Sequence, residues 1–339
     1  MDRADSDNVL TVSLENGVAL LRMGDVGRGV NLVDERLLRA LDLTLAALEA
    51  DDDVIGAVLA STDSRTYLAG GDVAAFLEYR HKSEVVDAIA AGNAVLRRVE
   101  TWRKPLVAAV DGACLGGGTE LALATAGIVA TDSQHTRFGL PEVRLGLLPG
   151  LGGTVRLPRR VGLLKALDLL LSGRNVYPRE ALASGLVARV VAPERLIATA
   201  VDMVVALAGR GKRVGTGGSS GDWLPRRGGA RGWPVPRPAA LRFQACLRLP
   251  WLLDLVLARA RSRALAATHG NYPAPLRIVD VVGTWARLGR TAGEAAAATA
   301  FADLLFMPQA RSLIRLFFAR TAARKNPWAA AAKPVARVA

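Results

Sequence analysis

The sequence is poor in the residues that build disulfide scaffolds and metal sites. Cys114 and Cys246 are its two cysteines, which excludes a disulfide framework and makes a reducing compartment the simpler expectation. Its three histidines, His81, His135 and His269, lie far apart, so no Cys/His cluster has the spacing of metal ligands. We therefore expect neither disulfides nor a metal ion.

Long hydrophobic runs are also missing. A membrane-spanning helix needs about 18 uninterrupted apolar residues, and the sequence has no such run. Residues 1–7 lack the basic start and apolar stretch of a secretory signal. With 339 residues, of which 51% are hydrophobic, the chain is expected to fold as a cytoplasmic protein with two domains, or with one domain and a smaller helical attachment.

Charge is one-sided, because 44 basic residues face 31 acidic ones and only six of the 44 are lysine. A nucleic-acid role fits this composition poorly, since aromatic residues make up 5% of the chain and arginine is spread along it without a recognised module. A net charge of +13 can attract a polyanionic small molecule or an acidic membrane surface. A solvated basic surface without a dedicated partner explains the charge equally well, so both interpretations stay open.

The N-terminal pattern predicts a hairpin followed by a helix. Residues 9–14 and 18–23 read as strands around Asn16-Gly17, a dipeptide that tolerates the positive φ of a tight turn. Asp34 is then an expected N-cap, because leucines recur after it at helical spacing. These are Leu37, Leu38, Leu41, Leu45 and Leu48.

The following stretch alternates between short apolar strands and helices. Strands are predicted at 54–60 and 105–110, with a helix at 85–99 between them, which is a βαβ pattern. Residues 163–208 are mostly helical, interrupted by a short strand at 186–191. The pattern indicates an α/β protein.

The second half differs in composition. Residues 209–238 are rich in Gly, Arg and Pro and show no periodicity, which predicts a linker or an insertion. Residues 239–328 form a predicted helical segment, divided at 270–275. Residues 329–339 form a tail. The sequence shows no internal repeat.

Three glycine-rich pieces carry the candidate chemistry: residues 67–72, 116–120 and 139–154. Glycines after a strand let the backbone approach a ligand closely, and a helix that starts in a glycine run offers unpaired N–H groups. Two N–H groups that converge on one oxygen form an oxyanion hole, which stabilises a thioester carbonyl that is becoming an enolate. Each piece alone is a weak signal.

Glu120 and Glu142 are the candidate acid and base. Hydration of an unsaturated thioester needs an activated water at one carbon and a proton at the next, which two carboxyl groups can supply if only one of them is ionised. Taken separately, each has a structural explanation, since Glu120 lies near a helix start and Glu142 follows a proline in a first turn.

Taken in order, the three pieces resemble the enoyl-CoA hydratase/isomerase (crotonase) superfamily, and residues 116–158 closely match its central signature. The resemblance covers residues 8–208 and implies a crotonase-like spiral of ββα units. It also implies an oxyanion hole formed by the N–H groups of Gly71 and Gly117, with Glu120 and Glu142 as the acid/base pair.

The same resemblance implies substrate contacts. Ala69 would lie near the CoA adenine, and the acyl group would lie near Leu148, Pro149 and Gly150. It implies no cofactor, since coenzyme A is part of the substrate.

Residues 270–275 and 307–313 resemble the helical segment that follows the hydratase portion of the multifunctional fatty-acid oxidation complex alpha subunit. In that family an NAD-dependent 3-hydroxyacyl-CoA dehydrogenase domain comes next, and residues 329–339 resemble the lead-in to it. Because the sequence has no G-x-G-x-x-G, we expect no NAD site here, and a dehydrogenase domain that is separate or missing.

These observations predict hydration of 2-enoyl-CoA to 3-hydroxyacyl-CoA in fatty-acid beta-oxidation. A 3-enoyl-CoA isomerase is the first alternative, because it needs only one carboxylate. A non-catalytic subunit that docks a dehydrogenase or a thiolase is the second. The partners implied by the resemblance are an acyl-CoA, a thiolase beta subunit or a separate dehydrogenase, and other copies of the chain in a homo-oligomer.

Overall fold

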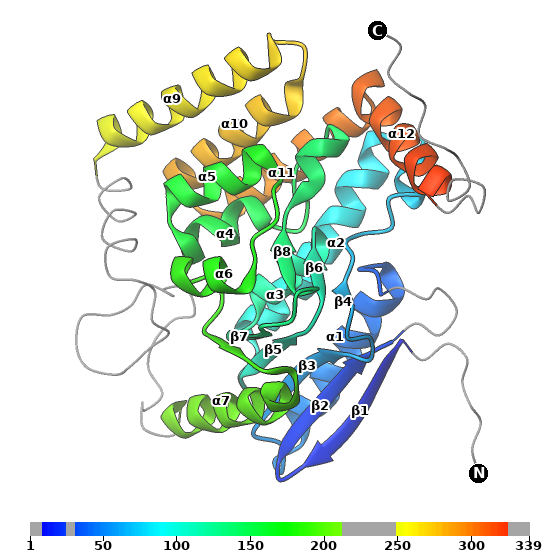
Figure 1. The fold of residues 1–339 in the computed structure, drawn as a ribbon, viewed down its shortest axis with the longest axis vertical. Helices are drawn as coiled ribbons and strands as arrows, with labels where there is room; N and C mark the ends of the chain where they lie inside the picture. The colour runs from blue at the N-terminus through cyan, green and yellow to red at the C-terminus, as the bar shows by residue number, and fades with distance from the viewer. Residues whose placement is uncertain (1–8, 25–30, 212–248, 325–339) are drawn as a thin grey trace, which may run out of the picture.

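The computed structural model describes residues 9–24, 31–211 and 249–324 (Figure 1). Its strands form a six-stranded sheet in the order β1-β2-β3-β5-β7-β9 and a three-stranded sheet in the order β4-β6-β8. All neighbouring strands are parallel except β1 and β2. This is the predicted α/β class.

The predicted N-terminal hairpin and helix are confirmed. Strands β1 (Leu10–Glu15) and β2 (Val18–Met23) pair antiparallel around Asn16 and Gly17, whose φ angles are 50° and 77°. Helix α1 (Glu35–Ala50) begins after Asp34, whose carboxylate accepts the N–H of Leu37 at 2.9 Å.

Three consecutive ββα units build the body of the protein. Each unit adds one strand to the large sheet and the next to the small sheet, so the units stack as a spiral, as predicted. The units are β3 (Gly56–Ser61), β4 (Thr66–Leu68) and α2 (Lys82–Thr101); β5 (Leu106–Val110), β6 (Ala113–Leu115) and α3 (Gly117–Ala124); and β7 (Gly127–Thr131), β8 (Arg137–Gly139) and α4 (Gly153–Val161).

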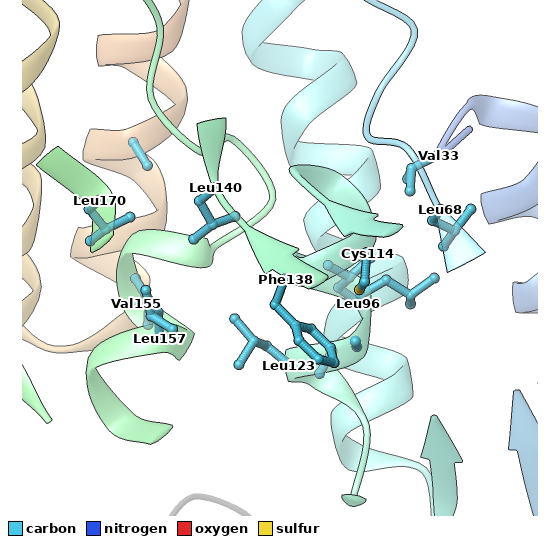
Figure 2. Packing of buried hydrophobic residues seen from close by; sticks show 14 of the residues in the cluster. Val33, Leu68, Leu96, Cys114, Leu123, Phe138, Leu140, Val155, Leu157 and Leu170 are labelled. Carbon is cyan, nitrogen blue, oxygen red and sulfur yellow. The ribbon is translucent and has the colours of Figure 1, made fainter. Parts of the chain in front are cut away.

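Both faces of the large sheet are covered. Val58 and Val107 point to one face and pack against Ala200 of α7 (Leu196–Gly211). Alternate side chains, such as Leu59, point to the other face and enter the main core. Cys114 of β6, Phe138 of β8 and Leu96 of α2 belong to this core (Figure 2).

Helix α5 (Leu163–Ser172), helix α6 (Pro178–Ser184) and strand β9 (Arg189–Val191) complete this part. The strand is shorter than the predicted 186–191. Helix α7 continues to Gly211, into the range predicted as a linker. The remainder of that linker and the tail at 329–339 lie outside the described residues.

The predicted helical segment contains α9 (Pro250–Thr268), α10 (Pro273–Leu288), α11 (Arg290–Leu305) and α12 (Pro308–Arg324). The break predicted at 270–275 is confirmed, since α9 ends where His269 and Gly270 adopt positive φ. Two further breaks, at Gly289 and at 306–307, were not predicted. Helices α10 and α11 pack against α4, and α11 also packs against α2 (Figure 1). Among the described helices, none has the length and apolarity needed to cross a membrane.

Candidate active site

Thr119 ties the start of α3 to the ends of two strands of the small sheet. Its buried hydroxyl lies 2.6 Å from the carbonyl of Cys114 and 2.9 Å from that of Gly139, and it can donate its one proton to either. The Gly116 N–H also donates to the Gly139 carbonyl, at 2.8 Å. These bonds set where the first turn of α3, and therefore Glu120, lies in the spiral.

Gly116 is where the glycine-rich pieces meet. It precedes α3 with a φ of 51°, a conformation that favours glycine. A Cβ atom at this position would lie 2.9 Å from Oε1 of Glu142 and 3.4 Å from Cα of Gly70. The structure therefore brings residues 67–72, the start of α3 and the Glu142 carboxyl group together.

Glu120 is buried and held by the backbone of α4. The residue is only 2% exposed, and its Oε1 accepts a hydrogen bond from the N–H of Gly153 at 2.6 Å. Burial raises the pKa of Glu120 to about 7, against the Gly153 hydrogen bond and the charge of Arg156, which lower it. Near neutral pH this carboxyl group can therefore take up and release a proton.

Glu142 lies in the short 3₁₀ helix η2 (Pro141–Leu145), and its carboxyl group is turned inward. Its Oε2 is buried and has no hydrogen-bond partner among the described residues. Burial, and secondly the nearby Glu120 carboxylate, raise the pKa of Glu142 well above its usual range. An ionised Glu120 therefore favours the protonated form of Glu142.

Gly71 and Gly117 both lie beside Val33. Gly71 forms a parallel β-bridge with Val33, and a Cβ atom on Gly117 would lie 3.3 Å from Cβ of Val33. Within the described ranges, neither glycine N–H donates to another protein group. Gly117 is the first residue of α3, where a helix supplies no acceptor. Two available donors beside one residue suit the predicted oxyanion hole.

The predicted substrate contacts lie on the same loops. The N–H of Ala69 donates to the carbonyl of Asn31 at 2.9 Å, one residue before the Gly70-Gly71 turn. Leu148, Pro149 and Gly150 are buried and lead into α4. Their contact with a substrate stays a prediction.

Sequence reasoning missed four residues beside this site: Asn93, Gly153, Arg156 and Glu294. Asn93 donates from Nδ2 to the Gly150 carbonyl at 2.9 Å, and Arg156 donates from Nη1 to the Leu151 carbonyl at 2.5 Å. Gly153 and Arg156 fall inside the matched signature, which was the available signal for them. Asn93 and Glu294 carried none, because each belongs to a long helix of ordinary composition.

Arg156 is a buried cation between two helices. It is 3% exposed, and its Nη2 lies 3.0 Å from Oε2 of Glu100 and 3.7 Å from Oε1 of Glu294. Arg290 contacts both of these carboxylates. The part of the chain that the structure describes has no cluster of three His, Cys, Asp or Glu side chains that could hold a metal ion.

Comparison with known proteins identifies the family. A family model described as enoyl-CoA hydratase/isomerase matches residues 13–214. Two curated relatives are named fatty acid oxidation complex subunit alpha. The one from Shewanella frigidimarina is 35% identical over 320 residues and the one from Shewanella amazonensis 36% over 321. Each match covers 94% of this chain and 42% of the relative, so the chain spans less than half of their length.

Solved structures agree with the fold. An enoyl-CoA hydratase from Bacillus anthracis is 29% identical with a TM-score of 0.55, over 59% of this chain and 77% of its own. Human mitochondrial delta3-delta2-enoyl-CoA isomerase has a TM-score of 0.63 over 94% of this chain and 100% of its own, but at 20% identity it supports the fold alone. The predicted family and fold are thus confirmed, and the chain belongs to the enoyl-CoA hydratase/isomerase family.

Proposed function

We propose that this protein hydrates 2-enoyl-CoA to 3-hydroxyacyl-CoA. The observation that carries the proposal is the buried pair formed by Glu120 and Glu142. Burial raises the pKa of both carboxyl groups, and the nearby Glu120 carboxylate raises the pKa of Glu142 further. Two neighbouring carboxyl groups do not readily ionise together, so one can act as the base while the other holds a proton, as hydration requires.

The reaction is assigned as follows. The N–H groups of Gly71 and Gly117 receive the thioester oxygen and stabilise the negative charge that develops on it. Ionised Glu120 removes a proton from water, whose oxygen attacks C3. Protonated Glu142 delivers its proton to C2. Water is thereby added across the double bond, leaving Glu120 protonated and Glu142 ionised. Transfer of a proton from Glu120 to Glu142, directly or through solvent, restores the starting state of the pair.

Ala69 is proposed to lie near the adenine of CoA, and Leu148, Pro149 and Gly150 near the acyl group. These assignments come from the family resemblance, supported by the position of both segments beside the two glutamates. The acyl-CoA is the substrate, and no further cofactor takes part in the proposed reaction.

Fatty-acid oxidation is the proposed setting, because the curated relatives are named as subunits of a fatty acid oxidation complex. A thiolase subunit or a 3-hydroxyacyl-CoA dehydrogenase is the proposed partner, in the cytoplasm. Since the chain spans 42% of those relatives, the activity of the whole relative is not carried over.

A hydration assay with crotonyl-CoA tests the proposal. Glu142→Gln removes the proton that the reaction needs at C2 while keeping the shape of the side chain. General acid–base catalysis contributes about 10²–10⁴-fold, so we expect kcat to fall by a factor in this range. Glu194→Gln, at an exposed glutamate of η3 (Pro193–Arg195), is the matched control and should keep the wild-type rate.

The same preparation distinguishes the alternatives. Conversion of a 3-enoyl-CoA without hydration of any 2-enoyl-CoA would assign an isomerase. A folded chain that binds a thiolase or dehydrogenase subunit but converts neither substrate, at any acyl chain length, would assign a docking subunit. Wild-type hydration by Glu142→Gln would contradict the role given to Glu142.

A further inference from the structure

We propose that Arg156 is a positioning residue for Glu120, and that the helical segment contributes to this device through Glu294 of α11. The inference rests on the proposed function, because it takes Glu120 as the base. It extends the site beyond the matched range 13–214, since Glu294 lies outside it.

Arg156 holds the backbone just before Gly153. Arg156 donates from Nη1 to the carbonyl of Leu151 at 2.5 Å, and its own N–H donates to the carbonyl of Gly152 at 2.8 Å. Both carbonyls lie directly before Gly153, whose N–H holds Oε1 of Glu120 at 2.6 Å. Arg156 therefore fixes the turn that presents this N–H, through its guanidinium and its own backbone N–H, so that the orientation of the Glu120 carboxylate depends on it.

Arg156 is buried, with 3% of the residue exposed. A buried guanidinium is costly unless its charge is paired, and its Nε has no hydrogen-bond partner among the described residues. Glu100 of α2 lies 3.0 Å from Nη2 of Arg156 and Glu294 lies 3.7 Å from it. Glu294 is itself buried, so α11 supplies a buried carboxylate beside Arg156.

Arg156 and its partners also act on the charge of Glu120. The cation of Arg156 favours the ionised form of Glu120, whereas the carboxylates of Glu100 and Glu294 weaken that effect. The charged groups that face Arg156 or its partners from the surrounding elements are Glu142 on η2, Arg97 and Glu100 on α2, Arg159 on α4, and Arg290 and Glu294 on α11.

Two substitutions with opposite expected effects test the proposal. In the pH profile of kcat for crotonyl-CoA hydration, the acidic midpoint reports the ionisation of the base. Arg156→Gln removes a positive charge and should move this midpoint to higher pH by roughly one unit. Glu294→Gln removes a negative charge and should move it to lower pH, by less because Glu294 acts from behind Arg156.

Two controls separate charge from shape. Arg156→Lys keeps the charge, but a lysine ammonium lacks the planar set of donors with which the guanidinium contacts both the Leu151 carbonyl and Glu100. The acidic midpoint of the pH profile should therefore stay in place while kcat falls. Arg261→Gln breaks an exposed pair with Asp280 on α10 and should leave both midpoint and kcat unchanged. Thermal unfolding and circular dichroism establish that each variant is folded.

The outcomes are distinguishable. Glu120→Gln tests the proposed base separately and should be inactive. If it is inactive, but the acidic midpoints of Arg156→Gln and Glu294→Gln shift in the same direction or do not shift, the proposal for Arg156 is overturned. If Glu120→Gln keeps the wild-type rate, the proposed function fails instead. If Arg156→Gln does not fold, Glu294→Gln decides, and a midpoint that stays or rises counts against the inference.

Discussion

Gly153→Ala gives a direct test of the contact that holds Glu120. A Cβ atom at this position would lie 3.0 Å from Oε1 of Glu120 and 2.9 Å from Cβ of Pro149. Ordinary contacts of a Cβ atom begin near 3.4 Å, so the carboxylate or α4 must move by a few tenths of an ångström. The 2.6 Å hydrogen bond from the Gly153 N–H is then lengthened or lost.

The expected loss of rate follows from that bond. A hydrogen bond to a charged group contributes about 1.5–3 kcal/mol, and each 1.36 kcal/mol corresponds to about a factor of ten in rate. We therefore expect kcat for crotonyl-CoA hydration to fall by roughly 10- to 100-fold. In the stability of Gly153→Ala, overpacking costs about 1–3 kcal/mol of folding free energy. Replacing glycine in a compatible conformation stabilises the fold by about 0.4–1 kcal/mol.

A glycine of α7 offers the matched control. Gly209 in α7 has no atom within 4 Å of its added Cβ, so Gly209→Ala should keep its rate and gain slightly in thermal stability. Steady-state kinetics and thermal unfolding are measured on both variants. A folded Gly153→Ala protein with the wild-type kcat would refute the view that this N–H orients the base.

Three other predictions concern folding and pH. Because burial raises the pKa of Glu142 in the folded state, its contribution to stability declines as pH rises above about 4.3, the pKa of the unfolded state. Glu142→Gln should therefore unfold at a higher temperature than the wild type at pH 8. Equal or lower stability of this variant would contradict the direction of the pKa shift. Thr119→Val removes the buried hydroxyl that donates its one proton to the Cys114 or the Gly139 carbonyl, and it should cost about 1–3 kcal/mol in denaturant unfolding. Thr119→Ser should retain most of this stability, and equal costs for the two variants would argue against the hydroxyl's role. Arg174 lowers the pKa of Glu180 to about 2, so the ion pair stabilises the fold above the unfolded pKa of Glu180 and ceases to do so as pH falls towards 2. Since both side chains are about one-third exposed, Arg174→Gln should cost less than about 1 kcal/mol of folding free energy at pH 7. A cost that persists undiminished towards pH 2 would exclude the ion pair as its source.

Local chemistry made much of the fold predictable. Asn16-Gly17 predicted the hairpin and Asp34 the start of α1, because a turn or a cap depends on a few neighbouring residues. The break at 270–275 was predictable from its glycine and prolines. The break at Gly289 was not, since a single glycine between two helical patterns is compatible with one long helix.

The sequence by itself determined the fold class and the family, and it predicted the pair of glutamates, because these follow from local pattern and from the order of the glycine-rich pieces. Only the tertiary structure decided how deeply the two carboxyl groups are buried and which groups surround them. Burial, the N–H of Gly153 and the cation of Arg156 act on the pKa of Glu120, and the Glu120 carboxylate acts on that of Glu142. Glu294 reaches this site from a helix far along the chain. Electrostatic effects depend on distance and burial after folding, and neither is written in the spacing of residues along the chain.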